Sequence, residues 1–265
     1  MKISIIGAGA MGGAIAEGLV KGEYIKKEDI CVADPSRISR DRFADMGITA
    51  TPSNQLAAQG ADVVCVVVKP WLVEQVLKGI KDVLDYEQQM LVVVAAGVKS
   101  ADIRTWMEKG NTMIPTFLAI PNIAIAQLAS MTFLVPTESA TPQHTEQVKQ
   151  LFDTMGESII TDEQHLAAGT TLASCGIAYA MRYIRAASEG GVQLGFRAAE
   201  AQHIVAQTLR GAASLLERPN AHPEAEIDRV TTPAGLTIRG LNAMEEAGFT
   251  NAVIRGLLAA LPEKK

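Results

Sequence analysis

The sequence predicts an α/β domain with a doubly wound parallel sheet, followed by an all-helical domain. Short β-branched runs alternate with helical patterns in the first part of the chain. Runs such as "DVVCVVV" and "MLVVVAA" are apolar on consecutive residues, which is typical of strands buried on both faces of a parallel sheet. After about Thr161 long Ala-rich helical patterns replace the strands, so we expect domains at residues 1–160 and 161–265.

The periodicity places the elements in order. In the first domain we expect strands at 3–6, 30–33, 63–68, 91–95, 113–120 and 133–135, with helices at 11–20 and 37–46. In the second we expect helices at 167–189, 197–217, 236–247 and 251–261. The two prolines of "RPNAHPE" make 218–224 a loop.

Composition excludes several partners. The chain has 265 residues, and 24 Lys and Arg against 29 Asp and Glu give a net charge of −5 without a basic block, so we expect no nucleic-acid partner. No apolar run reaches the roughly 18 to 20 residues of a membrane span, and "MKISIIGAGAMGG" lacks a signal-peptide cleavage region. Three cysteines outside CxxC pairs and four scattered histidines argue against disulfides and a metal site. We expect a cytoplasmic protein that acts on a small molecule.

A glycine motif follows the first strand. Gly7, Gly9 and Gly12 have the G-x-G-x-x-G spacing at the start of the first helix, which is the fingerprint of a Rossmann dinucleotide-binding domain. Glycine permits the tight turn and lets the backbone approach a pyrophosphate, while helix NH groups face the anion. The expected pyrophosphate-binding residues are Gly7, Ala8, Gly9, Ala10, Met11 and Gly12.

The end of the second strand bears on the choice of cofactor. Asp34 lies 22 residues after Gly12, near the position where an acid binds the adenosine ribose and disfavours a 2′-phosphate, which slightly favours NAD. In "DPSR", however, Ser36 and Arg37 are available to a phosphate if Asp34 turns away, and Asp34 is equally placed to cap the turn before Pro35. The expected cofactor is therefore NADP or NAD.

Two further strand ends are expected to line the nicotinamide half of the crevice. They read "VVVKP" (66–70) and "AAGV" (95–98), and ligands of open α/β sheets bind outside the carboxyl ends of the strands. Small residues at 95–97 allow a flat ring to lie against the backbone. Lys69 is either a catalytic acid, a ribose contact or a solvated lysine.

Taken together, seven short motifs resemble pyrroline-5-carboxylate reductases in order and spacing over nearly the whole chain. They are GAGAMG (7–12), TPSN (51–54), VKP (68–70), AAGV (95–98), PN (121–122), GIAY (176–179) and TTPAGLT (231–237). The resemblance implies a Rossmann domain and a helical dimerisation domain that completes the partner's active site. It also implies homodimers or rings of dimers that reduce the cyclic imine pyrroline-5-carboxylate to L-proline with NADPH or NADH.

The resemblance also assigns residues. It implies that Asn54 contacts the adenosine side of the cofactor. It places around the nicotinamide ribose and ring Val68, Lys69, Pro70, Ala96 and Gly97. In the family's PxGxT segment, backbone NH groups of Gly235, Leu236 and Thr237 would bind the substrate carboxylate, and the Thr237 hydroxyl would lie at the ring nitrogen.

Three segments depart from the family pattern. Residues 118–124 read LAIPNIA where the family has Arg-x-Met-Pro-Asn-Thr-Pro, residues 174–179 read SCGIAY for Gly-Ser-Gly-Pro-Ala-Tyr, and Ala234-Gly235 replaces Gly-Gly. All three lie near the active site that the resemblance implies. They bear on the identity of the substrate more than on the fold or the hydride chemistry.

The start of the helix expected at 236–247 has two interpretations. No carboxylate occurs in its first turn, so a substrate carboxylate is one candidate for the negative charge there. In the other interpretation Thr232 simply caps a helix that packs inward.

Imine reduction needs hydride geometry, an anchor for the carboxylate and a hydrogen bond at nitrogen, but no strong acid or base. No lysine occurs between Lys149 and Lys264, which argues against β-hydroxyacid dehydrogenases, because these use a lysine on the helix after the Rossmann domain. We therefore expect a pyrroline-5-carboxylate reductase with Thr237 as the catalytic residue. The alternatives are a paralogue that reduces another cyclic imino acid, such as the six-membered homologue, or a non-catalytic dinucleotide-binding regulatory protein.

Overall fold

The chain forms two compact units in a computed structural model that describes residues 1–261. The first unit runs from Met1 to Ser174 and the second from Cys175 to Leu261. The boundary that we expect at 160/161 falls ahead of this division, before the helix at Glu163–Gly169. We keep it as a proposed module boundary, since the helices that follow one another along the chain start there.

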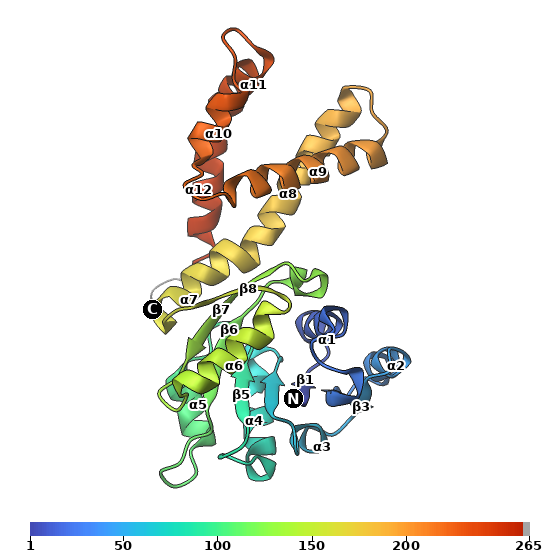
Figure 1. The fold of residues 1–265 in the computed structure, drawn as a ribbon, viewed down its shortest axis with the longest axis vertical. Coiled ribbons are helices and arrows are strands. Elements are labelled where there is room, and N and C mark those ends of the chain that lie inside the picture. The colour runs from blue at the N-terminus through green and yellow to red at the C-terminus, as the bar shows by residue number, and fades with distance from the viewer. Residues whose placement is uncertain (262–265) are drawn as a thin grey trace. The chain divides into compact units, whose positions relative to one another are not determined.

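An eight-stranded sheet forms the centre of the first unit (Figure 1). Its strands are β1 Ile3–Ile6, β2 Ile30–Ala33, β3 Thr49–Thr51, β4 Val63–Val66, β5 Met90–Val93, β6 Thr116–Ile120, β7 Ser130–Pro136 and β8 Gly156–Ile160. The spatial order is β3-β2-β1-β4-β5-β6-β7-β8, and all neighbours are parallel except β6 and β7. The order reverses between β1 and β4, which is where doubly wound sheets bind their ligands.

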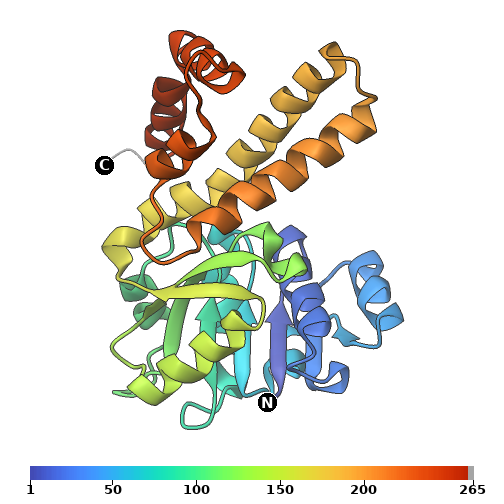
Figure 2. The same cartoon turned by 45° about the horizontal axis from the view of Figure 1, so that its top comes forward.

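Helices cover both faces of this sheet (Figure 2). They are α1 Ala10–Gly22, α2 Arg37–Asp45, α3 Asn54–Ala58, α4 Val73–Ile80, α5 Ser100–Met107, α6 Pro142–Asp153 and α7 Glu163–Gly169. One hydrophobic core holds side chains of α1, α2 and α6, and the other holds side chains of α3, α4, α5 and α7. In β4, Val63 and Cys65 belong to the first core and Val64 and Val66 to the second, as expected for a strand buried on both faces.

Several element ends differ from the sequence prediction. β4 and β5 stop at Val66 and Val93, two residues earlier than expected, and the chain beyond them forms loops at the edge of the sheet. The strand expected at 133–135 extends over Ser130–Pro136. The strands β3 and β8 were not expected; both lie at sheet edges, and their partly polar sequences lack a continuous apolar run.

The second unit is entirely helical. Its helices are α8 Gly176–Gln193, α9 Ala198–Leu216, α10 Pro223–Val230, α11 Leu236–Glu246 and α12 Phe249–Ala259. The loop expected at 218–224 ends early, because α10 starts at Pro223, where the fixed φ of proline suits the first helical position. A π-helical segment, Thr170–Cys175, interrupts the single helix expected at 167–189.

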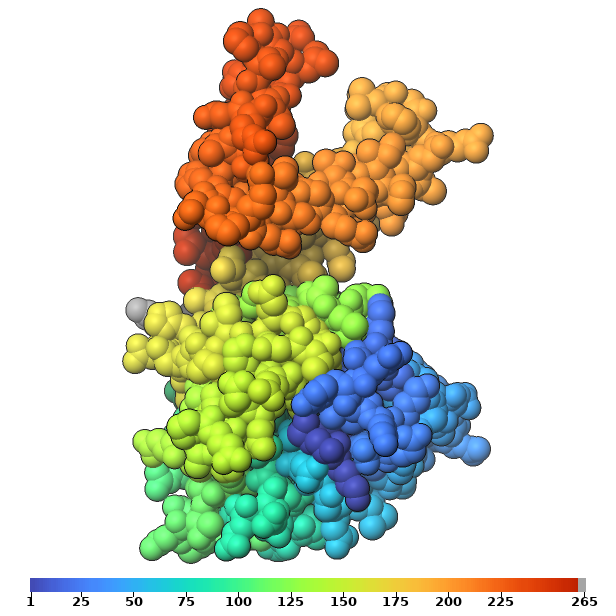
Figure 3. Space-filling model, viewed as in Figure 1, coloured from blue at the N-terminus to red at the C-terminus, as the bar shows by residue number. Residues whose placement is uncertain are grey.

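Apolar side chains of the second unit are mostly exposed. Ala201 is the one buried hydrophobic residue among its described positions. The space-filling view in Figure 3 shows the far end of the α8–α9 hairpin and the α10–α11 region standing apart, whereas α12 meets α8, where Tyr179 donates to the Gly256 carbonyl at 3.3 Å. A slender helical unit of this kind leaves much apolar surface without an intrachain partner. None of the helices within residues 1–261 has the length and apolar character needed to cross a membrane.

Candidate functional site

The three glycines of the motif differ in what a side chain at each position would meet. Gly7 has a φ of +101°, and a Cβ on it would lie 2.3 Å from the Val67 carbonyl oxygen. A Cβ on Gly12 would lie 1.8 Å from the Gly7 carbonyl oxygen. A Cβ on Gly9, in contrast, would meet no atom within 4 Å. Gly7 and Gly12 are thus required by the protein itself, whereas Gly9 leaves room for a group from outside.

Helix α1 presents an uncapped N-terminus beside this space. Its N-cap residue is Gly9, which makes no side-chain hydrogen bond, and the first turn holds no acidic residue. Gly9 and Ala10 are both exposed. The free NH groups and the helix dipole therefore favour an anion at this position.

Asp34 bridges the glycine loop and the turn that follows β2. Its Oδ2 accepts a hydrogen bond from the Ala8 amide at 2.7 Å, and its Oδ1 accepts one from the Ser36 amide at 2.8 Å. Arg40 Nη1 donates to the carbonyl oxygens of Asp34 and Pro35, each at 2.8 Å. The turn-capping interpretation of Asp34 is therefore present in the structure, and both carboxylate oxygens already have protein donors.

The start of α2 lies directly beyond Asp34. Ser36 is its N-cap, with Oγ accepting from the Ser39 amide at 3.4 Å, and no acid occupies the first turn. The Arg37 side chain is 86% exposed and makes a 3.4 Å ion pair with Asp41. An exposed pair of this kind contributes little stability, so the Arg37 guanidinium is available to an anionic ligand.

The residues expected around the rest of the cofactor also lie in the first unit. Val68 is next to the glycine loop, since its Cγ1 is 2.8 Å from the position of a Cβ on Gly7. Lys69 and Pro70 are exposed; Lys69 is the N-cap of a 3₁₀ turn, Pro70–Leu72, that follows β4, and Pro70 is its first residue. Asn54 is the first residue of α3 and is half-buried.

Ala96 and Gly97 are exposed in the loop between β5 and α5. The neighbouring Ala95 and Val98 are buried, and Gly97 has a φ of +82°. The loop is joined to the end of β4 by a 2.9 Å hydrogen bond from the Val94 amide to the Val66 carbonyl. The carboxyl ends of β1, β4 and β5 therefore share one sheet edge, as expected for a dinucleotide crevice.

The TTPAGLT segment lies in the second unit and leads into α11. The N-cap of α11 is Gly235, without a side-chain hydrogen bond, and the first turn contains no acid. The interpretation in which Thr232 caps this helix is therefore wrong. A Cβ on Gly235 would lie 2.4 Å from Thr232 Oγ1 and 3.0 Å from the Thr232 carbonyl oxygen, so a side chain there would displace Thr232. Leu236 is 80% exposed and Thr237 is exposed, which leaves the helix start open.

The altered Pro121-Asn122 segment is well ordered by local hydrogen bonds. Asn122 Oδ1 accepts from the Ala124 amide at 3.0 Å, and the Asn122 amide donates to Ser130 Oγ at 3.1 Å. Ser174, in the π-helical segment, donates from Oγ to the Pro121 carbonyl at 2.9 Å. Sequence reasoning missed this link, and the polar residues that break the apolar run from 166 to 181 were its only signal.

Burial makes the two cysteines of the sheet strands unreactive. Burial raises the pKa of the Cys65 thiol to about 12, so this residue is neutral at ordinary pH and belongs to the core. Burial also raises the pKa of Cys31. Within residues 1–261 no group of three or more His, Cys, Asp or Glu side chains is placed to hold a metal ion.

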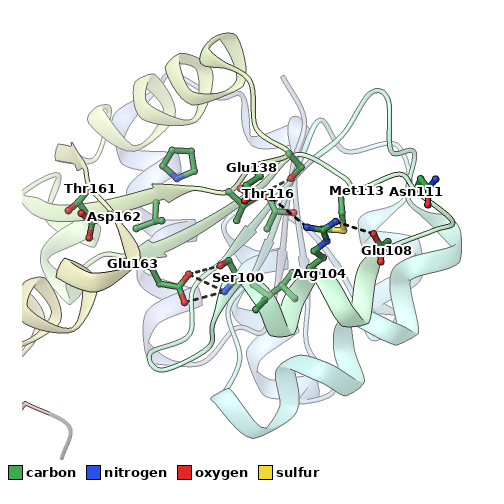
Figure 4. Close-up of a pocket in the computed structure, with 16 residues that line it drawn as sticks. Ser100, Arg104, Glu108, Asn111, Met113, Thr116, Glu138, Thr161, Asp162 and Glu163 are labelled. Carbon is green, nitrogen blue, oxygen red and sulfur yellow. Dashed lines mark hydrogen bonds and ion pairs between the residues drawn. The ribbon is translucent and has the colours of Figure 1, made fainter. Parts of the chain in front are cut away.

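A cavity of about 660 Å³ lies elsewhere in the first unit (Figure 4). It is bounded by α5, by residues around the paired ends of β6 and β7, and by the start of α7. Its polar wall includes Ser100, Arg104, Glu108, Glu138, Asp162 and Glu163. None of the residues expected to bind the cofactor or the substrate lines this cavity, so size alone does not identify the active site.

The doubly wound sheet, the open glycine loop and the uncapped α1 define an NAD(P)-dependent oxidoreductase. Residues 2–97 match the family model "NADP oxidoreductase coenzyme F420-dependent", and residues 163–265 match "Pyrroline-5-carboxylate reductase dimerisation". Pyrroline-5-carboxylate reductase 2 of Dictyostelium discoideum is 34% identical over 97% of this chain and 90% of its own length. The chain therefore belongs to the pyrroline-5-carboxylate reductase family, which confirms the resemblance seen in the short motifs.

Two further relatives agree with this assignment. Pyrroline-5-carboxylate reductase 1 of Dictyostelium discoideum is 38% identical over 97% of this chain, which spans only 48% of that longer relative. The solved structure of 1-pyrroline-5-carboxylate reductase from Streptococcus pyogenes is 29% identical, with a TM-score of 0.85 over 98% of this chain and 96% of that one. Sequence and fold thus match family members over nearly the whole chain.

Proposed function

We propose that this protein reduces pyrroline-5-carboxylate to L-proline with a reduced nicotinamide dinucleotide, as an enzyme of proline biosynthesis. Family membership over nearly the full length of the chain is the observation that carries the proposal. The open space at Gly9, next to a helix start without an acid, fits the pyrophosphate of such a cofactor.

We infer that NADPH is the preferred donor. Both oxygens of Asp34 accept amide hydrogen bonds within the protein, which reduces the repulsion that a free acid would exert on a 2′-phosphate. Ser36 and the exposed Arg37 at the start of α2 supply a hydroxyl, helix NH groups and a positive charge beside that position. The family model matched by residues 2–97 is also one of NADP oxidoreductases.

The substrate would bind at the start of α11. Backbone NH groups of Gly235, Leu236 and Thr237 would hold the carboxylate, because the helix has no acid and no side-chain cap of its own. The Thr237 hydroxyl would hydrogen-bond to the ring nitrogen. When bound, the reduced nicotinamide supplies a hydride from C4 to the imine carbon, and the C=N double bond of the protonated imine becomes a single bond. Residues Ala96, Gly97, Val68, Lys69 and Pro70 would orient the ring and ribose.

The protein would work as a homodimer or as a ring of dimers. The second unit carries many exposed apolar side chains, and residues 163–265 match a dimerisation module. A cytoplasmic location is supported by the three free cysteines, since such thiols persist in a reducing compartment.

The test is a steady-state assay with each reduced nicotinamide, on pyrroline-5-carboxylate and on its six-membered homologue. We expect turnover on the five-membered ring, faster with NADPH, and a loss of about tenfold to a hundredfold in kcat for Thr237→Ala, since one positioned hydrogen bond is removed. Thr237→Ser keeps a hydroxyl and should retain most activity. A preference for the six-membered ring would support the paralogue, and nucleotide binding without turnover would support a regulatory protein.

A further inference from the structure

Helix α5 is capped by a side chain from a distant part of the chain. The Ser100 amide lies 3.4 and 3.3 Å from the two carboxylate oxygens of Glu163, and Ser100 Oγ donates to Glu163 Oε2 at 2.5 Å. The two residues are 63 positions apart, and both are partly buried. Figure 4 shows the Glu163 carboxylate pointing at Ser100 across the edge of the cavity.

This contact replaces a local cap. The N-cap residue of α5 is Lys99, which makes no side-chain hydrogen bond to the helix. A carboxylate at a helix start accepts free NH groups and interacts favourably with the dipole. Asp102 already places one acidic side chain in the first turn, so what Glu163 adds is the side-chain acceptor for the Ser100 amide that Lys99 does not provide.

The same contact fixes one end of the loop that carries Ala96 and Gly97. At the other end, the Val94 amide is bonded to the Val66 carbonyl of β4. Ser100 comes only three residues after Gly97, so a shift of the α5 start would move the exposed part of the loop. Between them, the side chain of Val98 is buried, and the Lys99 carbonyl accepts hydrogen bonds from the Asp102 and Ile103 amides of α5, which couples the loop to the helix start.

We propose that Glu163 is a positioning residue for the nicotinamide end of the cofactor, acting through Ser100 on the loop at 95–99. This inference rests on the proposed function, in which Ala96 and Gly97 lie beside the nicotinamide. Glu163 touches neither cofactor nor substrate in this account. It determines where the loop stands when the ring binds.

The neighbouring acid provides a matched control. Asp162 is the N-cap of α7, and its Oδ1 accepts from the amide of His165 at 2.9 Å. That contact is local to α7 and does not reach Ser100. Asp162→Ala and Glu163→Ala thus remove one carboxylate each from adjacent positions, but only the second releases α5.

The experiment compares two ligands by titration of the full-length protein: NADPH, and 2′-phospho-ADP-ribose, which lacks the nicotinamide ring. For Glu163→Ala we expect the Kd of NADPH to rise about threefold to tenfold, as for loss of a hydrogen bond to a charged group at a partly exposed site, with little change for the analogue. Ser100→Ala should raise the Kd of NADPH by a smaller factor. The double variant should resemble Glu163→Ala alone, because both changes break the same contact.

Asp162→Ala should leave both Kd values unchanged, even where it lowers Tm as much as Glu163→Ala does. The inference is overturned if Glu163→Ala changes both ligands equally or neither, or if Asp162→Ala gives the same selective loss. Wild-type protein that binds neither ligand would instead overturn the proposed function, and this inference with it.

Discussion

Ala234 adopts a backbone conformation that glycine would tolerate better. Its φ is +57°, in the left-handed region where an L-residue with a Cβ is strained by roughly 1–2 kcal/mol. Ala234→Gly removes that strain but raises the entropy of the unfolded chain, which costs about 0.4–1 kcal/mol. We expect a net stabilisation of about 0.5–1 kcal/mol, measured by denaturant unfolding.

The control for this change is Ala206→Gly, at an exposed position inside α9. It should destabilise the protein by roughly 1 kcal/mol, because glycine is unfavourable in a helix interior. If both substitutions destabilise equally, Ala234 is not strained.

At the scale of single residues, the sequence predicted where the candidate site residues lie better than it predicted their hydrogen-bond partners. The spacing of Gly7, Gly9 and Gly12 placed the loop because the motif directly follows an apolar strand and begins a helical pattern. The sequence left three interpretations of Asp34, because the choice among them depends on where the amides of Ala8 and Ser36 point after folding. No local pattern in the sequence pairs Glu163 with a serine 63 residues away.

A substitution at the start of α11 can distinguish an effect on helix stability from an effect on substrate binding. Leu236 is highly exposed at the first helical position, so Leu236→Asp should stabilise the helix by about 0.3–1 kcal/mol through its dipole. The same carboxylate would repel that of the substrate. We expect an unchanged or higher Tm together with a KM for the imine raised about tenfold or more, because the anion site is already occupied by a charge.

The control is Leu236→Asn, whose side chain is neutral and has nearly the same shape as that of the Asp variant. It should leave KM for the imine within about threefold of the wild type, since it adds no charge. Equal KM values for the Asp and Asn variants would mean that the substrate carboxylate binds elsewhere.

Among elements, the buried strands were the most predictable. β1 and β2 have the bounds expected from their apolar runs, since burial on both faces demands such runs. β3 has only three residues and includes an exposed threonine, so its pairing with β2 leaves no periodic signal. The π-helical segment is a change of hydrogen-bond register within a continuous helical pattern, and composition does not report register.

The whole molecule requires a partner for its helical unit. Ile254 and Leu258 are exposed, four residues apart on one face of α12. Replacing both by lysine would place two charges in an apolar interface, so we expect dissociation to monomers in analytical ultracentrifugation.

Residue 252 projects from the opposite side of the same helix, so Ala252→Lys should leave the oligomer intact. An unchanged sedimentation coefficient for the Ile254→Lys, Leu258→Lys variant would exclude this face of α12 from the interface.

At the scale of the molecule, the change from an α/β to an all-helical region was predictable from hydrophobic periodicity. The need for a second subunit was not, because apolar helix faces look the same in a sequence whether they pack within one chain or between two. Dimerisation was expected only from the family resemblance. The sparse core of the second unit now gives that expectation a physical reason.

The central claim is that the open glycine loop binds the dinucleotide whose hydride reduces the imine. The most direct measurement is NADPH oxidation in the presence of pyrroline-5-carboxylate, by the wild type and by Gly9→Ala. A methyl group on Gly9 meets no protein atom but fills the space left for the pyrophosphate. We predict imine-dependent oxidation by the wild type, and for Gly9→Ala an unchanged Tm with kcat/KM for NADPH lowered about tenfold or more, because the backbone can no longer approach the phosphate. Absence of imine-dependent oxidation by the wild type, or full activity of Gly9→Ala, would contradict the account.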